Sequence, residues 1–160
     1  MAEDSTTLRP MTPGDLAAVS QLGIASKGSW GYDADQMRVF AKELTLSPEA
    51  FDGLLVAEVA CRGEEIVGYY TIRQHADGIT ELEHLFVAPE WFHRGIGGTL
   101  YGSALQQAAA HGFAKLTIIA DPHSAGFYEK LGAKKTGDHQ SGIPNRIIPI
   151  YEVVTGAQLE

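Results

Sequence analysis

The chain has 160 residues, a single cysteine, and 20 acidic against 12 basic residues, which gives a formal net charge of −8. This length suits one domain with a single substantial core, so we expect one domain over residues 1–160. The acidic balance argues against nucleic acid or an anionic membrane as the main partner. No apolar run approaches the roughly 18 residues of a membrane span, and no basic-then-apolar leader opens the chain, so we expect a cytoplasmic protein.

The first elements read in order are a strand and two helices. A short strand is expected at 6–12. Pro13 and Asp15 then open a helix with apolar residues at helical spacing, namely Leu16, Val19, Leu22 and Ile24. SKGSWGYD (26–33) is rich in turn residues and predicts a loop, and a second helix is expected near 34–45.

Three strands should follow. Apolar and aromatic runs at 53–60 and 65–74 are separated by Arg62-Gly63-Glu64, which predicts a hairpin. A third strand is expected at 79–89, after the turn formed by Asp77 and Gly78.

The second half of the chain alternates helices and strands. A helix at 96–111 carries an apolar stripe and stops at Gly112, and a buried strand is expected at 115–121. A short helix at 124–131 and two strands at 133–139 and 145–154 complete the order. The fold class is therefore α/β in the α+β sense: a mixed, mostly antiparallel sheet with one parallel βαβ crossover, flanked by helices.

Gly95, Gly97 and Gly98 stand where the helix at 96–111 begins. Glycine disfavours a helix by up to about 1 kcal/mol against alanine, so the cluster suggests a ligand close to the backbone. Free N–H groups at a helix start favour phosphate or pyrophosphate. The Walker pattern is absent because no lysine follows the glycines, and the dinucleotide pattern GxGxxG is weakened because Leu100 stands at its third glycine.

WFHRGIGG, after LFVAPE and before a helix, resembles the acyl-CoA pyrophosphate loop of the GNAT superfamily N-acetyltransferases. That loop reads Gln/Arg-x-x-Gly-x-Gly/Ala. Gly95 and Gly97 match its glycines, Arg94 takes a commonly basic position, and Phe92 departs from the Gln/Arg position.

SAGFYEKLGA (124–133) resembles the family's second motif, Ala-x-x-Phe-Tyr-x-Lys-x-Gly. Phe127 and Tyr128 match, Ser124 replaces the alanine, and Asp121 falls where many members carry asparagine. The two motifs are separated by one strand, and the element order over 6–154 also resembles the family.

The resemblance implies direct transfer of an acetyl group from acetyl-CoA to a primary amine of a small molecule or peptide, in a ternary complex. It assigns acetyl-CoA binding to Leu85, Phe86, Val87, Phe92, His93, Arg94, Gly95, Ile96, Gly97, Gly98, Thr99, Asp121, Ser124 and Tyr128. Backbone N–H groups of 85–87 would polarise the thioester, and Tyr128 would protonate the leaving thiolate. The histidines show no HxxxH or Cys-His cluster, so we expect no metal.

Glu81 and Glu83 match the two positions where family members carry the base that deprotonates the amine. Period-2 alternation places Glu81 and Glu83 on one strand face with Leu85 and Val87. His84 falls on the opposite face, where we expect a hydrogen-bonded core residue.

The acceptor pocket is expected to be lined by Trp30 and Tyr32, with Arg146 as a group that binds a substrate carboxylate or is simply solvated. A catalytically idle acyl-CoA-binding domain is the alternative function, kept open by Phe92 and Asp121. A nucleotide-dependent oxidoreductase ranks third, and a homodimer is left open.

Overall fold

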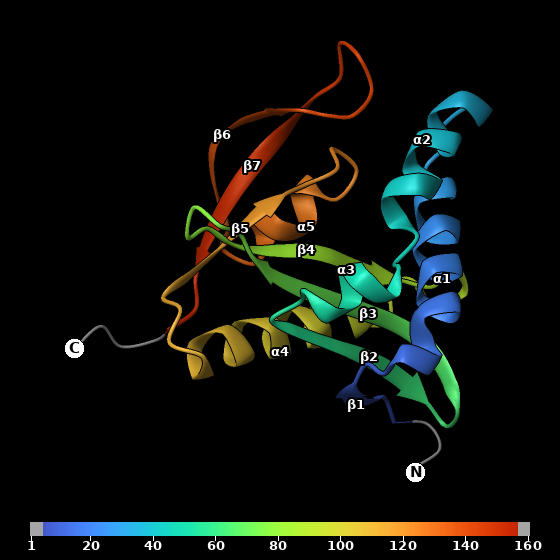
Figure 1. Ribbon diagram of the computed structural model, residues 1–160, viewed down its shortest axis with the longest axis vertical. Coiled ribbons are helices and arrows are strands. Elements are labelled where there is room, and N and C mark those ends of the chain that lie inside the picture. Colours follow the sequence, from blue (N-terminus) through green and yellow to red (C-terminus); the bar gives the residue numbers. More distant parts are fainter. Residues whose placement is uncertain (1–4, 157–160) are drawn as a thin grey trace.

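A seven-stranded mixed sheet forms the centre of the protein, whose computed structural model describes residues 5–156 (Figure 1). The strand order is β1-β2-β3-β4-β5-β7-β6, and every neighbouring pair is antiparallel except β4 and β5. The strands are β1 (Thr7–Pro10), β2 (Val56–Arg62), β3 (Glu65–Gln74), β4 (Thr80–Val87), β5 (Lys115–Ile119), β6 (Lys134–Gln140) and β7 (Ile147–Val154). The predicted fold class and the crossover from β4 through a helix to β5 are confirmed.

Five α-helices accompany the sheet: α1 (Leu16–Gly28), α2 (Ala34–Leu44), α3 (Pro48–Asp52), α4 (Ile96–Ala110) and α5 (Ala125–Lys130). Single 3₁₀ turns stand at Pro13–Asp15 and Pro89–Trp91. The prediction ended α1 too early, because the structure continues it through Gly28. It also missed α3, although Ser47 caps that helix by accepting a hydrogen bond from the Ala50 N–H, and Pro48 opens it.

The helices divide between the two faces of the sheet (Figure 1). α4 packs Leu100 and Ala104 onto one face, where they meet Tyr70 of β3 and Leu116 of β5. α1 packs on the other face, where Val19 and Leu22 meet Tyr69 of β3, together with α3. The sheet is therefore covered on both faces over β2 to β4.

The register between β3 and β4 shifts by one residue. Thr71 pairs with His84 whereas Ile72 pairs with Leu82, so Glu83 is an extra residue in β4. A β-bulge of this kind breaks the alternation of side chains. The predicted faces therefore hold only after the bulge. Leu85 and Val87 pack in the α4 core, and His84 and Phe86 contact Tyr69 on the α1 face, as expected. Leu82, expected beside His84, packs in the α4 core instead.

β4 and β5 pair only near their beginnings, at Glu81 and Thr117. β5 keeps its pairing with β7 through Ile119, so the later part of β4 and the end of β5 face one another across a gap. Ala88 donates its N–H to the Val67 carbonyl of β3. Because N–H groups alternate in an antiparallel ladder, those of Leu85 and Val87 point into the gap.

Candidate active site

The start of α4 owes its shape to two left-handed residues and two further glycines. Gly95, the N-cap, has φ = 82°, and His93 has φ = 64°. A β-carbon on Gly97 would lie 3.3 Å from the Phe127 ring, so this glycine permits close packing of α4 on α5. A β-carbon on Gly98 would meet no atom within 4 Å, which leaves its backbone open to a ligand.

A cavity of about 310 Å³ lies at this helix start, and we call it the glycine-loop pocket. Most of the residues predicted to bind the cofactor line it: Leu85, Phe86, Val87, Phe92, His93, Gly95, Ile96, Gly97, Gly98, Ser124 and Tyr128. Three do not. Arg94 stacks over the Trp91 ring at 4.8 Å, Thr99 donates its hydroxyl to the Gly95 carbonyl, and Asp121 lies in the neighbouring cavity.

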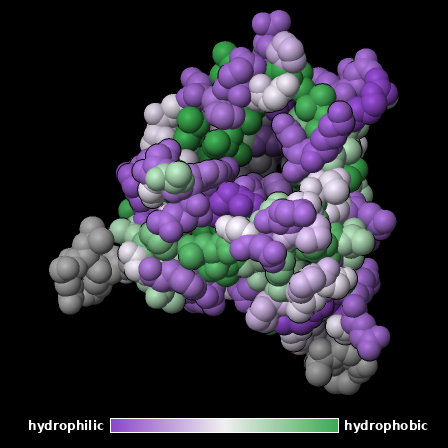
Figure 2. All heavy atoms as spheres, in the orientation of Figure 1, coloured by the Kyte–Doolittle hydropathy of each residue, from purple (hydrophilic) through white to green (hydrophobic). Residues whose placement is uncertain are grey.

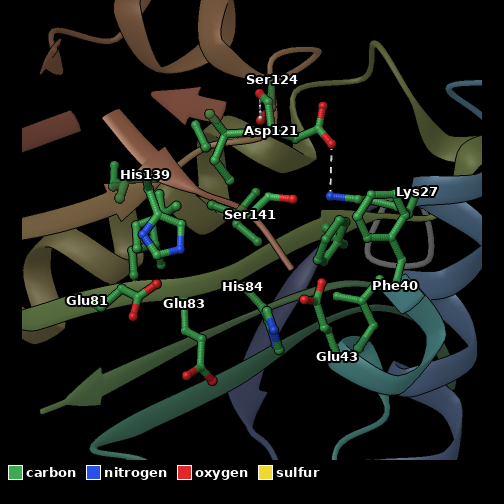
Figure 3. Close-up of a pocket in the computed structure, with 18 of the residues that line it drawn as sticks. Lys27, Phe40, Glu43, Glu81, Glu83, His84, Asp121, Ser124, His139 and Ser141 are labelled. Carbon is green, nitrogen blue, oxygen red and sulfur yellow. Dashed lines mark hydrogen bonds and ion pairs between the residues drawn. The ribbon is translucent and has the colours of Figure 1, made fainter. Parts of the chain in front are cut away.

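A second cavity of about 260 Å³, the polar pocket, opens between α1, α2, the gap beside β4, and the β6–β7 hairpin. The surface is hollowed there, with hydrophilic side chains around the opening (Figure 2). The lining includes Lys27, Glu43, Glu81, Glu83, His84, Asp121, His139, Ser141 and Arg146 (Figure 3). The two pockets meet, because both are lined by Trp30, Leu85, Phe86, Ser124 and Tyr128.

Tyr128 stands at this junction. Its side chain is 6% exposed and packs against the rings of Phe127 and Tyr101. Its hydroxyl makes no hydrogen bond to any residue from 5 to 156. Burial raises the pKa of the phenol, so the hydroxyl keeps its proton at neutral pH and has a free proton to donate.

Asp121 holds the polar pocket together at its upper end in Figure 3. Its Oδ2 accepts from Lys27 Nζ at 2.8 Å, from Arg146 Nη2 at 2.9 Å and from the Tyr32 hydroxyl at 2.6 Å. Its Oδ1 accepts from the backbone N–H of His123. Burial opposes ionisation of Asp121, but the hydrogen bonds outweigh it and lower the carboxyl pKa to about 2.

The three residues predicted to line the acceptor site, Trp30, Tyr32 and Arg146, differ in how they contact the two pockets. Trp30 lines both pockets and stacks on His123 with ring centroids 5.4 Å apart. Tyr32 is not among the lining residues of either pocket, but its hydroxyl donates a hydrogen bond to Asp121. Burial together with this hydrogen bond raises the pKa of Tyr32 to about 12. Arg146 is 14% exposed, so it is not a solvated arginine, and only its Nη2 makes a hydrogen bond within residues 5–156.

The two carboxylates predicted as bases both line the polar pocket, and each contacts one nitrogen-bearing side chain. Glu83 binds Arg73 Nε at 2.7 Å, and Arg73 also donates to the Ala50 carbonyl of α3. Glu81 lies 2.6 Å from His75 Nε2. Both pairs hold the carboxylates on the sheet side of the pocket, below Asp121 in Figure 3.

Two lining residues were missed. His84 was expected to be a hydrogen-bonded core residue, but its Nδ1 is buried without a partner and it lines the pocket. Glu43 of α2 also lines the pocket and has no ion-pair partner within the described range. Gly142 leaves room for the Glu43 carboxylate, since a β-carbon on residue 142 would lie 2.6 Å from its Oε2. Alternation placed Glu83 and His84 on opposite faces, but the bulge at Glu83 lets both line the pocket.

Among residues 5–156, no cluster of three or more metal-ligating side chains occurs and no helix is long and apolar enough to cross a membrane.

The sequence model described as the acetyltransferase (GNAT) family matches residues 23–133. The chain belongs to this family. Among curated proteins, mycothiol acetyltransferase from Corynebacterium glutamicum is 30% identical over 80 residues. That match spans 48% of this chain and 27% of the longer relative.

Solved structures of GNAT proteins share the fold at low sequence identity. A GCN5-related N-acetyltransferase from Rhodopseudomonas palustris superposes with a TM-score of 0.80 at 22% identity, covering 94% of this chain and 96% of its own. PaiA N-acetyltransferase from Thermoplasma acidophilum, solved with coenzyme A, gives 0.75 at 20% identity, with 92% and 98% covered. A GNAT acetyltransferase from Brucella melitensis, solved with acetyl-CoA, gives 0.68 at 19% identity, with 98% and 92% covered.

Proposed function

We propose that this protein transfers an acetyl group from acetyl-CoA to a primary amine of a small molecule or peptide, directly and within a ternary complex. The observation that carries the proposal is the junction of the two pockets at Tyr128, beside the gap between β4 and β5. One pocket begins at open helix N–H groups suited to pyrophosphate, and the other is lined by charged side chains suited to an amine. Two solved relatives hold coenzyme A or acetyl-CoA.

Each part of the site has a proposed task. The start of α4 holds the pyrophosphate, and the backbone N–H groups of Leu85 and Val87 polarise the thioester oxygen in the gap. Tyr128 donates its proton to the sulfur as the C–S bond breaks, because burial raises the pKa of the phenol and it therefore still holds its proton when negative charge builds on the sulfur. Glu81 and Glu83 attract the ammonium group of the acceptor and receive its proton through water.

Arg146 and Lys27 give the acceptor pocket a cationic end. The two cations share one carboxylate, Asp121, and Arg146 has N–H donors left over beside the pocket. An acceptor that carries a carboxylate near its amine would satisfy them.

A thermal-shift series with acetyl-CoA, CoA, NAD and ATP, followed by an amine library read through release of free thiol, tests the proposal. We expect stabilisation by acetyl-CoA and CoA alone, and thiol release that depends on an amine. Stabilisation by NAD or ATP instead would favour a nucleotide-binding protein. Binding of acetyl-CoA with no amine acetylated would favour the alternative, an idle acyl-CoA-binding domain.

A further inference from the structure

His84 is the polar side chain of β4 that lies nearest to the proposed thioester position on the acceptor side. It directly precedes Leu85, and the bulge at Glu83 turns it toward α1 and α2, which supply Lys27, Phe40 and Glu43 to the same pocket. Glu81 lies roughly 13 Å from Leu85 along the strand, at about 3.3 Å per residue. A carboxylate at that distance cannot touch the attacking nitrogen.

Two of the neighbouring carboxylates, Glu83 and Asp121, are also committed to other partners, whereas Glu43 lies on α2 and not on the strand that holds the thioester. Arg73 holds Glu83, and both Lys27 and Arg146 hold Asp121. The side chain of His84, in contrast, makes no hydrogen bond within residues 5–156. Its Nδ1 is buried without a partner, so Nε2 is the ring nitrogen left to meet a ligand in the pocket. A buried ring nitrogen without a partner destabilises the folded state, so an apolar residue would serve better if packing were its task.

We propose that His84 is the catalytic residue that takes the proton directly from the acceptor amine. The role rests on the proposed acetyl transfer and adds a direct base to the water-mediated one. His84 accepts one proton from R–NH₃⁺, and the free amine attacks the thioester carbonyl to form the C–N bond. The C–S bond then breaks, Tyr128 protonates the thiolate, and the nitrogen loses its second proton through water to restore Tyr128. One proton leaves His84 for solvent in each cycle.

The charges around His84 suit this task. Burial lowers its pKa, Arg73 and Lys27 lower it further, and Glu83 opposes them. The imidazole is therefore neutral at neutral pH and ready to accept a proton. The titratable groups that line the same pocket are Lys27, Glu43, Glu81, Glu83, Asp121, His139 and Arg146. The Tyr69 ring contacts the imidazole, and Arg73 acts on it electrostatically. Glu43 extends from α2 into the same pocket and would stabilise the charged imidazolium (Figure 3).

The test is the pH dependence of kcat for wild type and His84→Asn, with His111→Asn as the matched control. Asparagine keeps a polar group near the Nδ1 position but does not titrate, and His111 lies at the end of α4 outside both pockets. We expect His84→Asn to lower kcat about 10²-fold at pH 7. Acetyl-CoA affinity should stay within about twofold of wild type, and the deficit should shrink as pH rises toward an amine pKa near 10.

A kcat for His84→Asn equal to that of His111→Asn, or a deficit that does not change with pH, overturns the role of His84 alone. A wild-type protein that acetylates no amine overturns the proposed function as well. If His84→Asn does not fold, the ring of His84 can be titrated by NMR in the wild-type acetyl-CoA complex, with assignment through its contacts to Tyr69 and Phe86. Its pKa should coincide with the acidic limb of the kcat profile, and a clear mismatch contradicts the proposal.

Discussion

Individual side chains at the pocket junction divide into those that are saturated with partners and those that are free. Asp121 accepts hydrogen bonds at both oxygens, so its task is to hold the pocket wall. The side chains of Tyr128 and His84 have no hydrogen-bond partner within the described residues, although each is packed among other rings. Free polar groups in packed surroundings are expected where chemistry takes place, because they must exchange protons with a substrate.

Tyr128→Phe should lower kcat about 10²-fold and leave acetyl-CoA affinity and thermal stability close to wild type. The hydroxyl that is removed makes no hydrogen bond to residues 5–156, so that part of the fold has none to lose. Tyr151→Phe is the matched control, since the Tyr151 hydroxyl donates to Glu129 away from both pockets. That control should lose stability and keep its turnover. Steady-state kinetics with full turnover in Tyr128→Phe would remove the proton donor from the mechanism.

Asp121→Asn should destabilise the protein at pH 7, because Lys27 and Arg146 would lose their shared counter-ion. The folded-state pKa of about 2 lies below the ordinary value of 3.8, so this carboxyl stabilises the fold above pH 3.8. The contribution, about 2 kcal/mol, is lost as pH falls toward 2. Urea unfolding from pH 7 to pH 3 should show the gap between wild type and variant closing, whereas Asp52→Asn, an exposed control, should show none.

At the scale of elements, the start of α4 and the gap beside β4 form the proposed cofactor site. The three glycines at the helix start have three different tasks: Gly95 adopts a left-handed conformation, Gly97 admits the Phe127 ring, and Gly98 stays open. A substitution at Gly95 or Gly97 would therefore disturb the fold as well as the ligand site. Gly98 is the position that separates the two effects.

Gly98→Leu should weaken acetyl-CoA binding at least about tenfold while the protein stays folded. Leucine favours a helix over glycine by up to about 1 kcal/mol, so stability should hold or rise. Gly102→Leu is the control: it lies one turn later in α4, its β-carbon would also meet no atom within 4 Å, and it lies outside the glycine-loop pocket. Calorimetry that finds equal acetyl-CoA affinity in the two variants would contradict the anion site.

Across the whole molecule, features set by a contiguous stretch of sequence could be predicted, whereas features that depend on contacts between distant residues could not. The glycine loop and the Tyr128 helix are contiguous motifs, and most of the residues predicted from them line the glycine-loop pocket. Asp121 binds Lys27, Tyr32 and Arg146, which come from distant parts of the chain, so no local sequence pattern predicts this network. The bulge at Glu83 depends on pairing with β3, so alternation read from one strand put Leu82 on the wrong face.

The most direct test of acetyl transfer in this pocket is the rate of thiol release from acetyl-CoA by the full chain, with and without a panel of primary amines. Matched pairs that differ only in a carboxylate, such as lysine and 1,5-diaminopentane, also report on Arg146 and Lys27. We predict amine-dependent thiol release, matched mole for mole by acetylated amine in mass spectrometry, with the carboxylate-bearing member preferred. Acetyl-CoA binding without any amine-dependent release from wild-type protein would contradict the proposed function.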